Sequence, residues 1–358
     1  MIESNKNIAW LTSLPSPYWI PIWNKLSSNF DLKVFFTNKE NNERGWQIPP
    51  SSKWKHHTFS KRVFYLGQAQ IIPNPFGFRK ICREAEILII GGGWEVPVHA
   101  FSMAYARMQR MEVYIISESV LESHRFKGRT VRLIRFLVFS LATKIISVGP
   151  RSTLAILETG IKRKKILELF NPVNVEFFNS ISKSTKRAKF IGHRFIAVGR
   201  LIELKNFESI VRSFNLMSES TDTLTIAGEG PLRSSLERCV ADLNLQDQVF
   251  FTGQLSQIEL AKLYADSCTL ILASTNEVWG MVATEALSAG CHVVVSDNCG
   301  VSTFVKGMRG TYICNTSIDS IATCMQESKS RYSGQIMNPE ILNFTPERFA
   351  RELSSAIF

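Results

Sequence analysis

The chain of 358 residues is poor in the features that mark secreted, disulfide-stabilised and metal-dependent proteins. It has seven cysteines, an odd number at scattered positions with no Cys-x-x-Cys pair. This pattern predicts no disulfide framework and indicates a reducing compartment. No His, Cys and Asp residues stand at the spacing of metal ligands, so we expect no metal site.

Long hydrophobic runs and targeting segments are also missing. The first fifteen residues lack a basic region followed by an apolar one, so no signal peptide is predicted. The most apolar stretch, residues 136–142, is bounded by Arg135 and Lys144 and is too short to span a bilayer. We therefore expect a cytoplasmic protein, and the length favours about two domains.

Charge is divided unevenly along the chain. Residues 1–194 contain 30 Lys/Arg and 13 Asp/Glu, whereas residues 195–358 contain 12 and 18. A basic half favours an anionic partner or an anionic membrane surface. Nucleic acid would also suit this charge, but no recognition motif supports it, and we expect no nucleic-acid partner.

The segment 124–144 within the basic half has two interpretations. It combines basic and apolar side chains at three- and four-residue intervals: Arg125, Arg129, Arg132 and Arg135, with Leu133, Phe136, Leu137 and Phe139. Such a pattern is typical of an amphipathic helix at a membrane interface. It is equally that of an ordinary domain helix with a solvated basic face.

In both halves, apolar strands alternate with helical segments, a pattern that is typical of a parallel α/β fold. The first half offers strands at 7–12, 32–37, 87–90, 113–117 and 144–148. In the second half, residues 249–252 and 269–273 read as buried strands, and 281–289 reads as a helix ending at Gly290.

Two carboxylates stand around the start of that helix. Glu277 lies in the loop before it, and Glu285 falls on the same helical face as Met281. Both should border a cleft at the carboxyl end of a strand, where doubly wound sheets bind ligands. Carboxylates there suit the adjacent hydroxyls of a sugar, although solvated surface charges remain an alternative.

The start of the helix adds an anion site. Backbone N–H groups at Gly280, Met281 and Val282 have no partner within the helix, and Gly280 permits close approach of a phosphate or hydroxyl. These groups complement the two carboxylates.

Upstream, a strand runs into Gly199 and Arg200, and Lys205 follows where a helix begins. Two cations beside a helix N-terminus suit a diphosphate. A second strand ends at a turn with Gly228 and Gly230, which allow close backbone approach at the same sheet edge.

The order and spacing of these motifs resemble the C-terminal half of family 4 retaining glycosyltransferases of the GT-B fold. The resemblance covers residues 195–305 and includes the glycines at 199, 228, 230, 253 and 290. It implies an α/β protein with two doubly wound Rossmann-like domains facing an interdomain cleft. The matching glycine of the Phe-Thr-Gly motif is Gly253, which we count among the donor-binding residues.

The same resemblance assigns roles to the site. Arg200 and Lys205 would neutralise the donor diphosphate, Glu285 would hold the ribose, and Glu277 would contact the donor sugar. The backbone of residues 280–282 would meet the sugar and phosphate.

Three positions depart from the family pattern. Trp279 stands where Phe is usual, His292 where Pro commonly follows the glycine, and Thr303 where a Glu is common. The last change puts one secondary donor contact in doubt.

In the first half, residues 15–18 resemble the opening of bacterial polysaccharide glycosyltransferases, with Trp19 in place of an arginine. This loop either faces the ligands or is a rigid turn, and the same alternatives hold for the glycines at 91–93. Many relatives place a histidine at a strand end where Glu118 falls here, so Glu118 is a candidate to orient an acceptor hydroxyl or accept its proton.

We therefore expect an acceptor-side domain at 1–180, a basic linker at 181–194, a nucleotide-sugar-binding domain at 195–340, and a C-terminal helix at 341–358 that crosses back to the first domain. The last of these follows from the resemblance.

The expected reaction transfers a sugar, with retention, from a UDP- or GDP-type donor to a glycan or lipid-linked glycan acceptor in cell-surface polysaccharide synthesis. No cofactor is expected. No Asp-x-Asp motif occurs, which argues against metal-bridged transferases of the other major fold. A nucleotide-sugar 2-epimerase of the same architecture and a non-catalytic nucleotide-sugar-binding protein remain alternatives.

Overall fold

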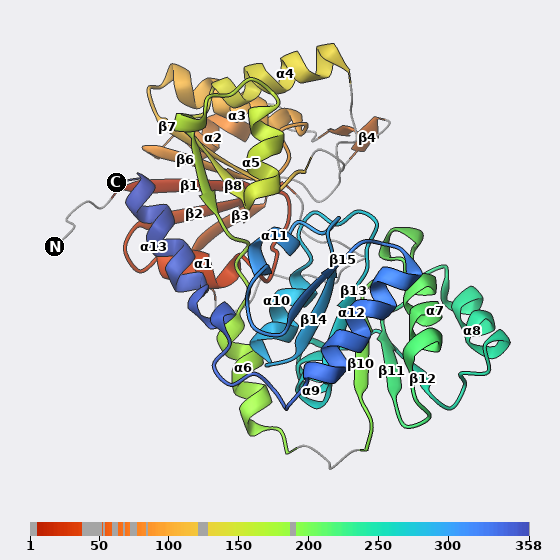
Figure 1. Ribbon diagram of the computed structural model, residues 1–358. Coiled ribbons are helices and arrows are strands. Elements are labelled where there is room, and N and C mark those ends of the chain that lie inside the picture. The colour runs from red at the N-terminus through yellow and green to blue at the C-terminus, as the bar shows by residue number, and fades with distance from the viewer. Residues whose placement is uncertain are drawn as a thin grey trace. The chain divides into compact units, whose positions relative to one another are not determined.

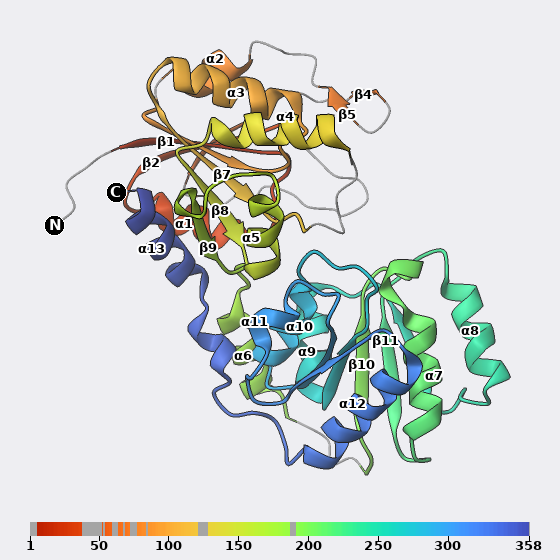
Figure 2. The same ribbon diagram turned by 45° about the horizontal axis from the view of Figure 1, so that its top comes forward.

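The computed structural model describes residues 6–37, 52, 54–58, 64–66, 69–71, 77–83, 85–120, 128–186 and 191–357. The chain divides into two compact units. Unit 1 comprises Met1–Pro172 and Pro346–Phe358, and unit 2 comprises Val173–Thr345. Each is a parallel sheet with helices on both faces, as Figures 1 and 2 show.

The sheet of unit 1 has the strand order β3-β2-β1-β6-β7-β8-β9, and all neighbouring strands are parallel. These strands are β1 (Asn7–Thr12), β2 (Asp31–Phe36), β3 (Lys55–Thr58), β6 (Ile87–Gly91), β7 (Glu112–Ser117), β8 (Lys144–Val148) and β9 (Ile166–Leu169). The strands β4 (Phe64–Leu66) and β5 (Ala69–Ile71) form a separate antiparallel pair. The five predicted strands are confirmed, whereas β3 and β9 were not predicted.

Helices cover both faces of this sheet. They are α1 (Ile20–Leu26), α2 (Gly77–Cys82), α3 (Pro97–Met108), α4 (Arg129–Ser140), α5 (Pro150–Leu157) and α13 (Pro346–Ile357), with a 3₁₀ turn η2 (Arg163–Lys165). Proline at the first turn of α1, α3 and α5 suits a helix start, because the missing N–H has no helical acceptor there. Helices α2, α3 and α4 lie on one face (Figure 2) and pack apolar side chains such as Met103 and Phe139 against the strands.

The other face of the unit 1 sheet is covered by an aromatic cluster. The Trp19 ring centroid lies 5.5 Å from that of Trp10 in β1 and 5.5 Å from that of Phe349 in α13. Trp10 also meets Trp23 of α1 edge-on at 6.0 Å. Trp19 is 8% exposed, so it packs between the sheet and the last helix of the chain. This packing holds α13 on unit 1 and gives Trp19 a structural role.

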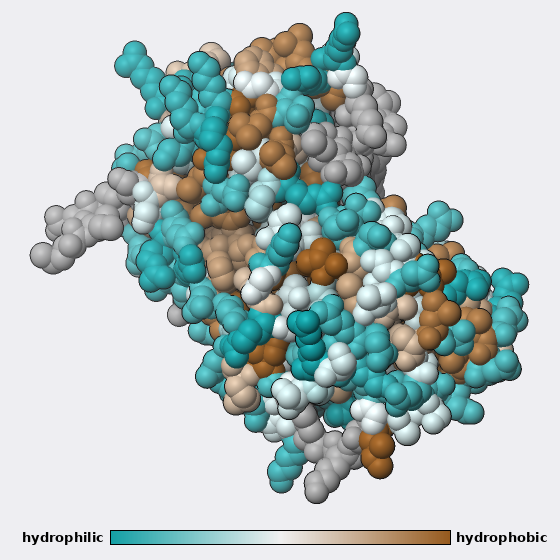
Figure 3. Space-filling model, in the orientation of Figure 1, coloured by the Kyte–Doolittle hydropathy of each residue, from teal (hydrophilic) through white to brown (hydrophobic). Residues whose placement is uncertain are grey.

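The structure confirms only part of the basic pattern predicted for residues 124–144, which include helix α4. Arg125 lies outside the described residues. Arg135 is buried, with its guanidinium 4.9 Å from the centre of the Trp94 ring. Leu133, Ile134 and Leu137 are each more than half exposed, and brown side chains lie among teal ones over this helix in Figure 3. Within the described part of the chain, no helix combines the length and apolar composition that a membrane span requires.

The sheet of unit 2 is also parallel, in the order β12-β11-β10-β13-β14-β15. Its strands are β10 (Arg194–Val198), β11 (Thr223–Ala227), β12 (Val249–Gly253), β13 (Thr269–Leu272), β14 (His292–Ser296) and β15 (Thr311–Cys314). The helices are α6 (Val175–Ser184), α7 (Phe207–Met217), α8 (Arg233–Asp242), α9 (Gln257–Asp266), α10 (Met281–Ser288), α11 (Ser302–Val305) and α12 (Ile318–Arg331), with 3₁₀ turns η3 (Glu203–Lys205) and η4 (Glu340–Asn343). Near-continuous apolar strands are expected when both sheet faces are covered, and β13 and β14 are buried throughout.

The boundary between the units differs from the predicted one at residue 180. Helix α6 belongs to unit 2, where it packs against α9 and α10, and the Ser182 hydroxyl donates to the Ala289 carbonyl at 2.7 Å. The predicted linker 181–194 therefore holds the end of α6, a segment outside the described residues at 187–190, and the start of β10. At the other end, η4 lies in unit 2 and α13 in unit 1, so the last crossing falls at residues 345–346.

The amino edge of the unit 2 sheet is closed by a buried polar network. His193, directly before β10, bonds through Nε2 to the Thr269 hydroxyl at 2.8 Å, and Thr269 meets the Ser328 hydroxyl of α12 at 2.7 Å. Asp222, fully buried, accepts the His193 N–H at 2.8 Å and pairs with Lys329 at 2.7 Å. Burial lowers the pKa of His193 to about 4, an effect that Asp222 opposes and that His292 and Lys329 reinforce.

This network predicts that unit 2 loses stability in mild acid. The unfolded chain protonates His193 near 6.5 and the folded state only near 4, so the stabilisation is complete above 6.5 and is lost as the pH falls between these values. From about pH 7 to pH 5 we expect a loss of about 2 kcal/mol from this residue. Calorimetric unfolding at both pH values should show it.

The matched variants are His193→Gln, which removes the titration, and His56→Gln, which removes an exposed ring in unit 1. The first should reduce the loss of stability between pH 7 and pH 5 by about 2 kcal/mol, and the second should leave it unchanged. Equal pH dependence in wild type and His193→Gln would contradict the assignment.

Candidate functional site

The strand order of unit 2 reverses at β10. Strands β11 and β12 lie on one side of it and β13, β14 and β15 on the other. In a parallel sheet the loops on either side of such a reversal diverge and leave a crevice at the carboxyl edge. Here the two loops are residues 199–206, after β10, and 273–280, after β13.

An ion pair joins these two loops. The Lys205 ammonium at the end of η3 contacts the Glu277 carboxylate, and the two side chains are 22% and 20% exposed. The Thr275 N–H also donates to the Leu204 carbonyl at 2.9 Å. The structure thus brings together two of the predicted site residues, 72 positions apart in the sequence.

Asn206 fixes the start of α7 next to this pair. Its backbone is left-handed, with φ of 57°, and its side-chain amide donates to the carbonyls of Ala273 at 3.2 Å and Thr316 at 3.3 Å. Asparagine tolerates this conformation better than most residues. Lys205 is therefore held from both sides, by Glu277 and by the turn at Asn206.

Glu277 is supported by the segment after β14, for which the sequence predicted only a departure from the family pattern at Thr303. It forms an isolated parallel bridge with Cys299, its N–H donates to the Asn298 carbonyl at 3.3 Å, and its carbonyl accepts the Gly300 N–H at 2.9 Å. These are backbone contacts, so no side-chain motif signals them. The loop after β14 thereby positions the carboxylate-bearing loop after β13.

Arg200 lies two residues after the end of strand β10 and is exposed. Its side chain forms no ion pair with any residue in the described ranges. The next residue, Leu201, donates its N–H to the Glu229 carbonyl at 2.9 Å, which anchors the loop behind Arg200. The Arg200 side chain is thus exposed to solvent on a loop whose backbone is held by a hydrogen bond.

The glycines of the site allow loops to touch through their backbones. Gly228 has φ of 139°, and a Cβ there would lie 1.9 Å from the Gly199 carbonyl oxygen. A Cβ on Gly230 would lie 2.5 Å from the Leu201 carbonyl oxygen. The Gly228 N–H donates to the Gly253 carbonyl at 2.8 Å. The predicted close approach is therefore between the loops after β10, β11 and β12.

Helix α10 begins at Gly280, which has φ of 103°. A Cβ there would lie 2.6 Å from the Leu272 side chain at the end of β13. Met281 and Val282 form the first turn and are partly exposed. The first N–H groups of a helix have no acceptor within it, so this turn offers donors at the same edge as Lys205.

Glu285 occupies a different environment from the one predicted. It is 3% exposed, and its Oε2 accepts a hydrogen bond from the Tyr264 hydroxyl of α9 at 3.1 Å. The helical spacing placed Glu285 beneath Met281 but gave no sign that α9 covers it. Tyr264 is the contact that sequence reasoning missed, because its sequence neighbours form no recognisable motif with Glu285.

Unit 1 has its own reversal of strand order, between β1 and β6. The loop at residues 13–19 follows β1, and the glycines at 91–93 lie at the end of β6 and in the loop after it. His99 of α3 bonds through Nδ1 to the Gly93 carbonyl at 2.8 Å, and burial lowers its pKa to about 4, so the ring is neutral near pH 7. Glu118, exposed, follows β7 at the same carboxyl edge.

Metal ligands do not cluster in the parts of the chain that the structure describes. No group of three or more His, Cys, Asp or Glu side chains there is arranged to hold a metal ion. All seven cysteines are free.

Known sequences resemble part of unit 2. Residues 176–328 match the family described as Glycosyl transferases group 1. The O-antigen chain mannosyltransferase RfbU of Salmonella typhimurium is 31% identical over 137 residues, which cover 38% of this chain and 37% of that protein. The alpha-monoglucosyldiacylglycerol synthase of Streptococcus pneumoniae is 27% identical over 165 residues, which cover 46% and 34%. These matches span about a third of the length of the relatives.

Solved structures share the fold of the whole chain. The Anabaena protein HepE in complex with UDP aligns with a TM-score of 0.69 and 15% identity, covering 98% of this chain and 100% of that one. The lipopolysaccharide outer core galactosyltransferase WaaB aligns with a TM-score of 0.72 and 17% identity, covering 98% and 99%. The predicted GT-B fold, with two Rossmann-like parallel-sheet domains, is confirmed.

The close contact at Gly228 leads to a stability prediction. Gly228→Ala adds a methyl group against the Gly199 carbonyl, whereas Gly307→Ala adds one at φ of 90° with nothing within 4 Å. Gly307→Ala should cost about 1 kcal/mol from backbone strain alone. Gly228→Ala should cost at least about 2 kcal/mol more, since backbone on both sides must shift. Thermal unfolding of both variants measures the difference. Equal losses of stability would show that the loops at Gly228 and Gly199 move apart without a further loss of free energy.

Proposed function

We propose that this protein is a glycosyltransferase that moves a sugar from a nucleoside diphosphate sugar to an acceptor hydroxyl. The observation that carries the proposal is the pair Lys205–Glu277, held beside the exposed Arg200 at the strand reversal of a group 1 domain. The likeness to HepE, whose structure contains UDP, supports a UDP-type donor, with GDP as the other candidate.

The donor diphosphate is met by Arg200, Lys205 and the first turn of α10 in this proposal. An ammonium group has three donors, so Lys205 can keep its contact with Glu277 and still donate to a phosphate oxygen. Arg200 adds a guanidinium whose planar fork suits phosphate. These fixed positive groups stabilise the leaving diphosphate, and we propose that the reaction needs no metal ion or other cofactor.

The carboxylates recognise the sugars. Glu277, oriented by Lys205 and by the backbone of residues 298–300, accepts hydrogen bonds from hydroxyls of the transferred sugar. Glu285, whose position is fixed by the Tyr264 hydroxyl, accepts from the donor ribose. The glycines 199, 228, 230 and 253 shape the loops around the nucleotide.

The proposed reaction retains the anomeric configuration. The acceptor oxygen forms a bond to the anomeric carbon as the bond from that carbon to the diphosphate oxygen breaks. The acceptor proton passes to the departing phosphate oxygen on the same face, so no protein nucleophile is needed. Glu118 of unit 1 orients the acceptor hydroxyl or takes its proton instead.

For the acceptor we propose a glycan or lipid-linked glycan in cell-surface polysaccharide synthesis. RfbU acts on O-antigen chains and WaaB on the lipopolysaccharide outer core, by their names. The excess of Lys and Arg in residues 1–194 suits an acceptor with a lipid phosphate and contact with an anionic membrane. The free cysteines suit the reducing side of that membrane, its cytoplasmic face.

Removing either cation should slow the reaction strongly. Arg200→Ala and Lys205→Ala should each lower turnover about 100-fold or more, because a charge contact to the leaving group is lost. Lys262→Ala removes an exposed lysine of α9 and is the matched control. The measurement is release of nucleoside diphosphate in the presence of acceptor. Wild-type rates in both site variants would contradict the proposed mechanism.

Donor binding can be tested before the acceptor is known. A ligand that binds only the folded state at about 100 times its Kd should stabilise it by about 2.7 kcal/mol. We expect a rise in melting temperature with one family among UDP, GDP and ADP sugars, much reduced in Arg200→Ala and Glu285→Ala. Arg200→Ala is the safer variant, because its side chain is exposed, whereas Glu285 is buried against Tyr264.

The results also separate the alternatives. Stabilisation by a donor without any transfer would favour a nucleotide-sugar-binding protein, and conversion of the donor sugar to its C2 epimer would identify an epimerase. If no sugar nucleotide stabilises the wild type, the donor-binding assignment is wrong.

A further inference from the structure

Unit 1 contains a basic pocket that the proposed reaction does not use. Its volume is about 250 Å³. The residues that line it are Lys33, Val34, Phe35, Lys55, His56, His57, Lys80 and Arg83. None of them is acidic. We call this set the β2–α2 pocket.

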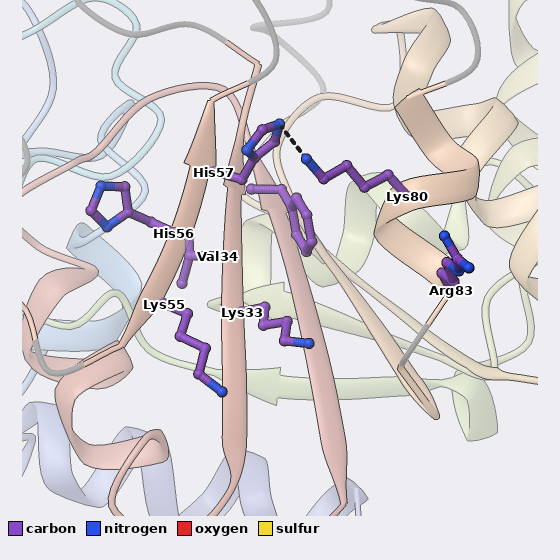
Figure 4. A pocket seen from close by; sticks show the side chains of 8 residues that line it. Lys33, Val34, Lys55, His56, His57, Lys80 and Arg83 are labelled. Carbon is purple, nitrogen blue, oxygen red and sulfur yellow. Dashed lines mark hydrogen bonds between the residues drawn. The ribbon is translucent and has the colours of Figure 1, made fainter.

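Strand pairing explains why the basic side chains converge. Lys33 of β2 lies opposite Lys55 of β3, and Phe35 lies opposite His57 two residues further along. Because residues two apart in a strand share a face, all four side chains stand on the same side of the sheet. Helix α2 covers that side, and Lys80 and Arg83 reach the pocket from it and from the residue after it (Figure 4).

The charged side chains among the residues that line the pocket are all cations. Lys80 Nζ lies 3.3 Å from His57 Nε2, an uncharged partner rather than a carboxylate. Burial lowers the pKa of His57, and Lys80 and His56 lower it further. Lys55 pairs with Asp31 at 3.1 Å, but that lysine side chain is 70% exposed, so the pair is weak. Holding several cations together costs free energy that a bound anion would recover.

We propose that the β2–α2 pocket binds the phosphate group of a second ligand, apart from the donor. Three flexible ammonium groups and a guanidinium beside two aromatic side chains, Phe35 and His57, suit a phosphate attached to a small organic group. The volume is below the range of pockets that enclose drug-sized ligands, so it suits a phosphate with a small organic group better than a whole nucleotide sugar. The pocket lies alongside β2 and β3 and not in the loops beyond their carboxyl ends (Figure 4).

The phosphate has two possible sources, a phospholipid headgroup or a soluble phosphate ester, and the proposal does not rest on the donor reaction. Glycerol 1-phosphate is the soluble probe. Vesicles of phosphatidylglycerol, with phosphatidylcholine vesicles as the uncharged reference, are the lipid probe.

The test compares two double variants that lose the same charge. Lys80→Gln/Arg83→Gln removes two cations of the pocket, one in α2 and one directly after it, and Arg129→Gln/Arg132→Gln removes two exposed cations from α4 of the same unit. The pocket variant should bind at least one probe about tenfold more weakly than wild type, and the α4 variant should bind as wild type. Titration calorimetry reads the soluble probe and vesicle co-sedimentation reads the lipid.

Each outcome decides the question. Loss of glycerol 1-phosphate binding in the pocket variant supports a soluble ester, and loss of vesicle binding supports a lipid headgroup. Equal binding by both variants, or loss only in the α4 variant, overturns the proposal. Loss of phosphate binding in Arg200→Ala places it at the donor site and also overturns it. The pocket variant should keep the donor-induced rise in melting temperature. A failure of the phosphate-pocket proposal can therefore be distinguished from a failure of the proposed function.

Discussion

The single direction of all strands within each of the two large sheets is the constraint from which the site follows. Every loop after a strand emerges at the carboxyl edge, and in unit 2 the opposite edge is closed by His193, Thr269 and Ser328. The loops that carry Arg200, Lys205 and Glu277 all lie at the carboxyl edge. The reversal of strand order at β10 then separates two of these loops, and the pair Lys205–Glu277 bridges them.

Around that pair, the protein uses backbone more than side chains to hold position. Gly199 and Gly228 touch through their main chains, and residues 298–300 bond to the main chain of Glu277. This leaves the charged side chains of the site for a ligand. The arrangement has the character of a preorganised site, in which the cations need little movement to meet negative charge.

Much of the fold and of the candidate site could be predicted from the sequence, because these features depend on local sequence patterns. Apolar β-branched runs predicted the strands, and Gly199, Arg200, Lys205 and Glu277 stand in the loops that follow β10 and β13, which parallel topology brings together. What escaped prediction depends on contacts between distant segments. The cover of Tyr264 over Glu285, the place of α6 in unit 2 and the basic pocket between β2, β3 and α2 arise from packing that has no sequence period. Trp19 was read as a ligand-loop residue or part of a turn, and its ring packs against the last helix of the chain.

That last helix has a consequence for how the protein is made. Unit 1 is discontinuous, because α13 adds its Phe349 to the cluster of Trp10 and Trp19 after the whole of unit 2. During synthesis unit 2 can complete its core as a contiguous segment, whereas the sheet of unit 1 lacks part of its aromatic cover until α13 has been made. Unit 1, whose synthesis begins first, is thus the last of the two units to complete its fold. Until then Trp10 and Trp19 lack their final cover, and they form the apolar surface that a chaperone would meet.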